Sequence, residues 1–388
     1  MNYYILPKNT INIQLKLNYY NKIEPYISTS QIFFLKKKQS QLNKLEINKE
    51  ELTNVKSVIN NLNNVFNNNN ICKLQITNQL YYELLEVINN CGIKDILINK
   101  HSLIYANISP NSSTSNSLFT SFRNNITSDI VYSCSFEYNL IYDMFIAKPI
   151  NKKIDLLFFE FKENDNTDIY KISKNIIIML YIICNTIIKG GTIIFKLEDC
   201  FYKIVIDFIY ILSNLFDKII VIKPTISNIT DSSKFFICKG FNYNQNNISN
   251  ICNSLLEQVY TYCYNINNVS NIVSGIYINS ILENKIPYYF INKLEEFNVI
   301  ISQQQIDSID QIIFLLKNKN KAEKIESIKK TNISKAIQWC EKYNVPHIKL
   351  LEKSNIFFKR NESENIINNN NNNDNDNDNN NDNDSNSI

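Results

Sequence analysis

The clearest pattern in the chain is a series of apolar runs, separated by short polar turns, between residues 154 and 241. Three of them, Ile154 to Phe161 (IDLLFFEF), Thr192 to Leu197 (TIIFKL) and Lys218 to Ile222 (KIIVI), are short and almost continuously apolar, which is typical of strands covered on both faces. Longer apolar stretches, from about Tyr170 to Ile188 and from Cys200 to Phe216, lie between them and indicate helices. The order strand, helix, strand, helix, strand predicts a parallel sheet with right-handed connections.

The end of this segment indicates a change in chain direction. A further strand, Lys234 to Phe241 (KFFICKGF), begins after a link of Pro, Ser, Thr and Asp residues that follows Ile222. A helical crossover needs roughly a dozen residues or more, so this strand must return antiparallel. A mostly parallel sheet finished by one antiparallel C-terminal strand is the topology of methyltransferases that use S-adenosylmethionine. The predicted fold class is therefore α/β, with a Rossmann-like methyltransferase sheet flanked by helical N- and C-terminal segments.

Helical patterns precede the sheet. Apolar positions recur near a 3.6-residue period between Glu50 and Asn90, and one helix is expected from Leu80 to Ile88, behind Thr77-Asn78. The run Asn67 to Asn70 is interpreted as a loop. The first strand of the sheet is predicted at Ser102 to Ile108, followed by a loop rich in Ser, Asn and Pro at positions 109–117.

Two further details concern turns and the C-terminal part. Gly190-Gly191 follows the first apolar helix, and we expect glycine to end that helix in a left-handed cap. Beyond about Asn246 the clearest helical patterns are Ile301 to Leu316 and Ile333 to Tyr343. Trp339 is expected to belong to a core, since an indole buries a large area.

Composition narrows the class of protein. The net charge of +3 is too small to indicate polyanion binding by itself. Nine cysteines without a Cys-x-x-Cys pair, with only His101 and His347 as imidazoles, favour reduced buried thiols over a metal site or disulfides. The longest apolar run, Ile176 to Ile188, is shorter than the roughly 20 residues of a membrane span. Without a signal-like N-terminus, we expect a cytoplasmic protein with no metal and no membrane partner.

The segment Lys189 to Phe241 resembles the C-terminal half of FtsJ-like RNA ribose 2′-O-methyltransferases, including the cap-specific ones. That family has a glycine turn, a strand ending in Lys, an amphipathic helix ending at Phe, then Lys-Pro, Ser-Arg and a strand ending near Cys-x-Gly. The matching positions here, in the same order, are Gly190-Gly191, Lys196, Phe216, Lys223-Pro224, Ser227, Ser232 and Cys238-Lys239-Gly240-Phe241. The layout of the chain is also similar to the FtsJ-like proteins of large DNA viruses.

The resemblance suggests a division of the chain into four parts. Residues 1–70 form an N-terminal, mostly helical segment, residues 71–245 an FtsJ-like methyltransferase domain, and residues 246–360 a helical appendage. Residues 361–388 are almost wholly Asn, Asp and Ser. Such a composition offers nothing to bury and predicts a disordered tail.

For catalysis, the resemblance implies a Lys-Asp-Lys-Glu set that tunes proton removal from a ribose 2′-hydroxyl. Lys196 matches the central lysine and ends its strand where open α/β sheets place their ligands. Alternatively, Lys196 ends a strand and simply extends into water. Glu160 falls where the aspartate is expected and is one methylene longer.

The other two members of the set differ in this chain. Aligning the helix before the first strand puts Tyr81 or Tyr82 at the position of the first lysine. At the position of the final glutamate, the chain has Ser233 and then Lys234. Lys196 and Glu160 are therefore the candidate catalytic residues.

The candidate cofactor loop follows the first strand. The family has a Pro-Gly-Gly turn there, because a Cβ would obstruct the close approach of the backbone to S-adenosylmethionine. This chain has Asn107 near the end of the strand and then Ser109, Pro110, Asn111 and Ser112. These residues can form a turn, and Asn tolerates a positive φ, so all five are candidates for binding S-adenosylmethionine.

Two functions are consistent with these residues. One is an RNA ribose 2′-O-methyltransferase, with mRNA caps as one substrate class, that uses S-adenosylmethionine. The other is a catalytically inactive methyltransferase fold that serves as an RNA-binding or scaffolding subunit, together with an active viral protein partner. RNA is the expected partner in both, and the location would be the host cytoplasm or the virion if the protein is viral.

Overall fold

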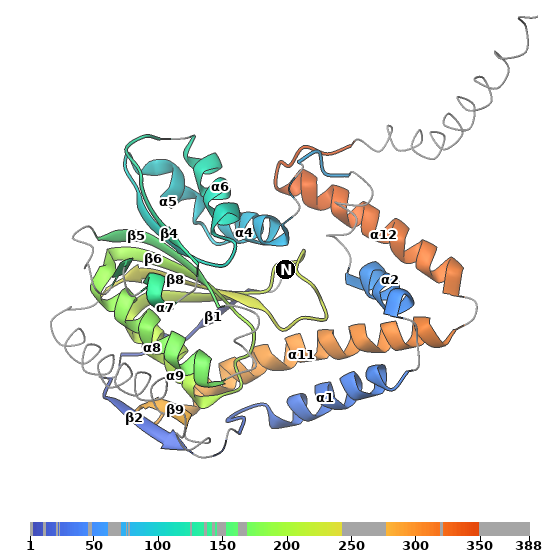
Figure 1. The fold of residues 1–388 in the computed structure, drawn as a ribbon, viewed down its shortest axis with the longest axis horizontal. Coiled ribbons are helices and arrows are strands. Elements are labelled where there is room, and N and C mark those ends of the chain that lie inside the picture. Colours follow the sequence, from blue (N-terminus) through green and yellow to red (C-terminus); the bar gives the residue numbers. More distant parts are fainter. Residues whose placement is uncertain are drawn as a thin grey trace, which may run out of the picture.

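A seven-stranded sheet is the centre of the fold (Figure 1). The computed structural model describes residues 3–10, 13–20, 22, 24–45, 49–60, 71–74, 76, 78–124, 126–135, 138–141, 144–145, 153–161, 169–242, 277–318 and 321–348. The strands lie in the order β1-β7-β8-β6-β5-β3-β4. Their bounds are Tyr3–Leu6 (β1), Ile104–Ile108 (β3), Ile130–Cys134 (β4), Ile154–Glu160 (β5), Ile187–Leu197 (β6), Phe216–Ile222 (β7) and Lys234–Phe241 (β8).

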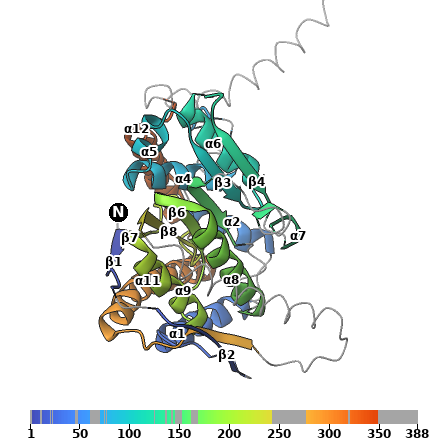
Figure 2. The same ribbon diagram turned by 90° about the vertical axis from the view of Figure 1, so that its left-hand side faces the viewer.

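The strand directions confirm the predicted Rossmann-like α/β fold. Strand β3 pairs in parallel with β4 and β5, and β5 pairs in parallel with β6. Strand β8 is antiparallel to both of its neighbours and lies between β6 and β7. The short strand β1 adds an antiparallel edge to β7, opposite the β4 edge (Figure 2). The sequence pattern did not reveal β1 or β4, because both are short and partly exposed.

Helices cover both faces of the sheet. On one face lie α8 (Ile169–Thr186) and α9 (Lys203–Leu215), and on the other lie α4 (Gln79–Asn90), α5 (Lys94–Asn99) and α6 (Ser112–Arg123). Because side chains alternate along a strand, Phe159 and Phe195 belong to the first core, whereas Phe158 belongs to the second. The Phe195 ring lies between those of Phe159 and Phe236, with centroid distances of 4.9 Å on both sides.

The predicted glycine cap is wrong. Helix α8 ends at Thr186, and β6 begins at Ile187 and includes both glycines. Gly190 does have a positive φ of 80°, but it lies in an irregularity of the β5–β6 pairing. The buried, β-branched Ile187 pairs with Ile154, and this pairing favours a strand over a further helical turn.

The predicted loop at positions 109–117 is also wrong, because α6 begins at Ser112. Its hydroxyl groups donate to carbonyls one turn back, as Ser117 does to Thr114 (2.8 Å) and Thr120 to Asn116 (2.9 Å). These local bonds satisfy the polar side chains inside the helix. Leu118 and Phe119 are fully buried and anchor it to the sheet.

The remaining elements come from both ends of the chain. Strands β2 (Leu15–Tyr20) and β9 (Tyr277–Leu282) form a separate antiparallel pair. Helix α1 (Thr29–Asn43) runs along α11 (Tyr288–Lys317), while α2 (Lys49–Asn60) and α12 (Lys321–Lys342) lie at the far end of α11 (Figure 1). The short helix α7 spans Tyr138–Ile141.

The expected helices are present, and Trp339 is a core residue. The predicted helices at 80–88 and 301–316 lie within α4 and α11, and the one at 333–343 matches the end of α12 to within one residue. Asn78 caps α4 by accepting from the Leu80 amide at 3.0 Å. Trp339 is 5% exposed and packs edge-on against Tyr82. The Asn67–Asn70 run and the tail at 361–388 lie outside the described residues.

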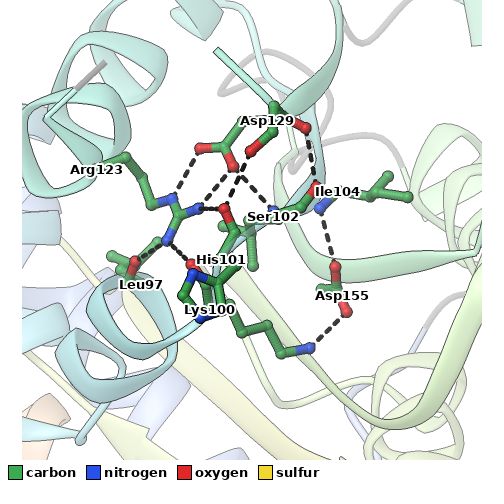
Figure 3. A network of polar contacts seen from close by, with 10 residues as sticks. Leu97, Lys100, His101, Ser102, Ile104, Arg123, Asp129 and Asp155 are labelled. Carbon is green, nitrogen blue, oxygen red and sulfur yellow. Dashed lines mark hydrogen bonds and ion pairs between the residues drawn. The ribbon is translucent and has the colours of Figure 1, made fainter. Parts of the chain in front are cut away.

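A buried ion pair fixes the amino edge of the sheet (Figure 3). The guanidinium of Arg123 contacts both carboxylate oxygens of Asp129, at 2.7 and 2.6 Å, and also donates to the carbonyl oxygens of Leu97 and Lys100. This contact lowers the pKa of Asp129, whose carboxylate also accepts from the Leu103 amide. The network joins the turns before β3 and β4, so it has a structural role away from the carboxyl edge.

Three expectations about composition can be compared with the described residues. The seven cysteines among them are free and buried, as expected for reduced thiols. No group of three or more His, Cys, Asp or Glu side chains that could hold a metal ion occurs in these ranges. Within the same ranges, no helix combines the length and the apolar character needed to cross a membrane.

The aromatic stack provides a test of the core. We expect Phe195→Ala to lower the free energy of unfolding by about 3–5 kcal/mol, because it leaves a cavity between two rings in a fully buried position. Phe33→Ala is the matched control, since Phe33 is 64% exposed, and it should change stability by no more than about 0.5 kcal/mol. Urea unfolding measures both, and equal losses would contradict the packing described here.

Candidate functional site

Polar side chains gather at the carboxyl edge of the sheet. Ser109 follows β3, Glu160 ends β5, and Lys196 is the last residue but one of β6. Glu160 and Lys196 are direct neighbours in the β5–β6 pairing. Lys234 starts β8 at this same edge, because β8 runs in the opposite direction. Open α/β sheets bind their ligands at this edge, so the structure brings the two predicted catalytic residues together there.

Lys196 lies between two carboxylates. Its Nζ is 3.0 Å from Glu83 Oε2 and 3.4 Å from Glu160 Oε1, and the three side chains are 16%, 2% and 10% exposed. The shorter contact is an ion pair without hydrogen-bond alignment, since Glu83 Oε2 has no hydrogen-bond donor among the described residues. The alternative interpretation, in which Lys196 extends into water, therefore does not hold.

The charge state of Lys196 follows from these contacts. Burial by itself lowers the pKa of an amine, but the carboxylates of Glu83 and Glu160 outweigh it, and the pKa of Lys196 is raised. Burial is also the main reason that the pKa of Glu160 is raised, and Lys196 partly offsets it. At neutral pH Lys196 is therefore an ammonium ion.

Glu83 is the residue that the sequence alignment missed. The alignment puts Tyr81 or Tyr82 at the position of the family's first lysine, and the Tyr82 hydroxyl bonds to the carbonyls of Leu74 and Ile76. The following residue, Glu83, faces Lys196 and also accepts from Gln79 Nε2 at 2.8 Å. A signal was present in the sequence: two glutamates three positions apart, Glu83 and Glu86, stand in an otherwise apolar helix, and both are buried.

Lys234 follows Ser233, the residue at the position of the family's final glutamate. Lys234 is 1% exposed, and its Nζ donates to the carbonyls of Glu198 at 2.5 Å and Ser232 at 3.2 Å. This lysine is therefore buried and bonded to the backbone at the carboxyl edge.

The turn between β3 and α6 is closed by its own hydrogen bonds. Ser109 Oγ donates to Glu160 Oε2 at 3.2 Å and accepts from the Asn111 amide at 3.0 Å. The buried Asn107 Nδ2 contacts the Ser112 carbonyl at 2.9 Å, as well as Ser115 Oγ and Asn116 Oδ1. Pro110 and Asn111 are exposed. Asn111 has a φ of −109°, so its tolerance of a left-handed conformation is not used.

The cavity beside Lys196 is small. It has a volume of about 10 Å³, which is room for roughly one water molecule. Sites for small organic ligands occupy about 300–1,000 Å³. The lining residues are Glu160, Phe161, Lys196, Leu197, Glu198, Asp231 and Ser233. Among the described residues, this cavity is much smaller than a site for a small organic ligand.

The link between β7 and β8 joins this edge to the helical appendage. Lys223 Nζ donates to the Asp231 carbonyl within the link. Glu86 is fully buried, and its carboxylate accepts from the Thr225 amide at 2.8 Å and from Trp339 Nε1 at 2.9 Å. Burial raises the pKa of Glu86. Glu86 therefore connects α4, the β7–β8 link and α12.

Comparison with solved structures gives neighbours of the fold, two of which are described below. No family model and no curated protein matches this sequence. A protein of Plasmodium falciparum assigned as a ribosomal RNA methyltransferase matches 42% of this chain and 96% of its own, with 16% identity and a TM-score of 0.30. A protein of Corynebacterium glutamicum assigned as a spermidine synthase matches 43% of this chain and 67% of its own, with 10% identity and a TM-score of 0.28. The strand order and directions define the fold.

The buried ion cluster can be tested by removing its cation. We expect Lys196→Met to lower the free energy of unfolding by about 3–5 kcal/mol, because Glu83 and Glu160 are then buried without a counter-charge. In a Glu83→Gln/Glu160→Gln background the same substitution should cost much less. Lys218→Met, at an exposed position, is the control for urea unfolding. A Lys196→Met variant as stable as this control would rule out the cluster.

Lys223 gives a second test, through pH. Burial lowers its pKa to about 8, from an ordinary value of 10.5. Between these values the unfolded chain binds more protons at this residue than the folded chain, so stability should rise with pH by up to roughly 3 kcal/mol. Urea unfolding of wild type and Lys223→Met from about pH 7 to 10.5 isolates this contribution. Parallel pH profiles would contradict the burial of the ammonium group.

Proposed function

We propose that this methyltransferase-fold chain is an RNA-binding or scaffolding subunit that does not itself transfer methyl groups. The observation that supports this most directly is the buried contact of Lys196 with Glu83 and Glu160. As part of the same proposal, the subunit acts in the cytoplasm beside an active protein partner, which is viral if this chain is viral.

The protonation of Lys196 argues against a catalytic role. One way to remove the proton of a ribose 2′-hydroxyl is through a general base that accepts it. Lys196 is an ammonium with a raised pKa and has no free lone pair for that role. Glu160 is the other candidate proton acceptor, but one of its carboxylate oxygens contacts Lys196 and the other accepts from Ser109.

The charged side chains around Lys196 and the small volume of the cavity beside it support the same conclusion. Glu83 places a second carboxylate beside Lys196, and Lys234 donates to a backbone carbonyl. The cavity at Lys196 has room for about one water.

An active RNA ribose 2′-O-methyltransferase that uses S-adenosylmethionine, with mRNA caps as one substrate class, is the second candidate. The juxtaposition of Lys196 and Glu160 on adjacent strands favours it. In that case Lys196 would be central, Glu160 would assist, and the turn from Ser109 to Ser112 would hold the donor together with Asn107.

Methyl transfer itself decides between the two candidates. We expect the purified chain to give no binding heat with S-adenosylmethionine at millimolar concentration and no transfer of labelled methyl groups to capped or uncapped RNA. A known RNA 2′-O-methyltransferase, assayed in parallel, is the positive control. Methyl transfer by the wild-type chain that disappears in Lys196→Ala would refute the non-catalytic assignment.

A further inference from the structure

Two adjoining hollows lie between the β7–β8 link and the helical appendage. One has a volume of about 670 Å³ and faces α12, and the other has a volume of about 430 Å³ and faces α11. They share Thr225, Ile229 and Ser308 in their walls. Figure 1 shows the link reaching from the sheet toward α11 and α12. We call the two hollows together the appendage trough.

The walls of the appendage trough carry an uneven set of charges. Lys223, Lys335 and Lys342 line it, and Asp307 is the one acidic side chain among the described lining residues. Helix α12 also contains the glutamates Glu323, Glu326 and Glu341, but none of them lines the trough. The cations of α12 therefore face the trough without nearby carboxylates from the same helix.

Many of the exposed side chains of the trough are hydrogen-bonding groups of α11 and α12: Gln304, Gln311, Ser327, Thr331 and Gln338. The walls also include apolar side chains, such as Ile229 and Ile328. Lysines, amides and hydroxyls are side chains that contact nucleic-acid phosphates and sugars.

We propose that the appendage trough binds a single-stranded RNA segment, with Lys335 and Lys342 contacting its phosphates. This inference rests on the RNA binding included in the proposed function and assigns it to α11, α12 and the β7–β8 link, away from Lys196. Each hollow has the size of a small-ligand site, and two in succession suit consecutive nucleotides. Lys335 and Lys342 lie two turns apart on α12 and are both exposed, so a strand can bridge them.

The experiment compares two double variants of the full chain. Fluorescence anisotropy follows binding of a labelled, uridine-only RNA of about 12 nucleotides, within the ~4–16 nucleotides that single-strand sites cover. Lys335→Gln/Lys342→Gln removes the trough lysines. Lys329→Gln/Lys330→Gln removes two exposed lysines of α12 that do not line the trough, so net charge and helix are matched. Circular dichroism confirms that both variants fold.

We expect the trough variant to bind about 25-fold more weakly than wild type at about 0.1 M salt, and its salt slope to fall by about 1.4, because two phosphate contacts are lost. The Lys329→Gln/Lys330→Gln control should stay within about twofold of wild type.

Three results would overturn the assignment, and they can be told apart. Equal affinity of both double variants would place the RNA elsewhere while leaving the proposed function intact. An absence of RNA binding by wild type, even at low salt, would remove both proposals. A polyglutamate peptide could also displace the labelled RNA as well as unlabelled RNA does at the same concentration of negative charge. That result would show that the trough binds acidic peptides instead.

Discussion

The direction of β8 is the constraint on which the rest of the structure depends. The chain leaves β7 at Ile222 and re-enters the sheet at Lys234, a link too short for a helical crossover. Strand β8 must therefore run antiparallel, and it lies between β6 and β7, where both of its edges are paired. As a result the whole link stays at the carboxyl edge of the sheet. There it places Asp231 and Ser233 beside Lys196, and it contacts the appendage, where Gln305 donates to the Thr230 carbonyl at 3.2 Å.

Charges buried at this edge are satisfied inside the protein. Removing an ion from water costs several kcal/mol, which the protein recovers only through close partners. Lys196 has two carboxylates, Glu160 also has Ser109, and Lys234 has two backbone carbonyls. The cluster is therefore stabilised by contacts within the protein.

The sequence predicted the sheet well because its signals are local: continuous apolar runs for the buried strands, and a link length that sets the direction of β8. It also placed Lys196 and Glu160 at one edge, since the ends of parallel strands meet there. The edge strands β1 and β4 were missed, because partial exposure removes the apolar run. The Ser-rich α6 was missed because its hydroxyl groups bond within the helix, which composition does not reveal. Glu83 could not be assigned from spacing, since which residue of α4 faces β6 depends on the rotation of the helix about its axis.

The lysines at the carboxyl edge of the sheet and those on α12 differ in their surroundings. Near Lys196 the carboxylates of Glu83 and Glu160 neutralise the ammonium and would repel a phosphate that came close. On α12, Lys335 and Lys342 are exposed, and the glutamates of the helix are not among the residues that line the trough. Polyanion binding depends on releasing counterions from phosphates, which exposed ammonium groups do and paired, buried ones do not. Electrostatics therefore separates the buried cluster around Lys196 from the trough proposed to bind RNA. Glu86, which contacts both Thr225 and Trp339, connects the two.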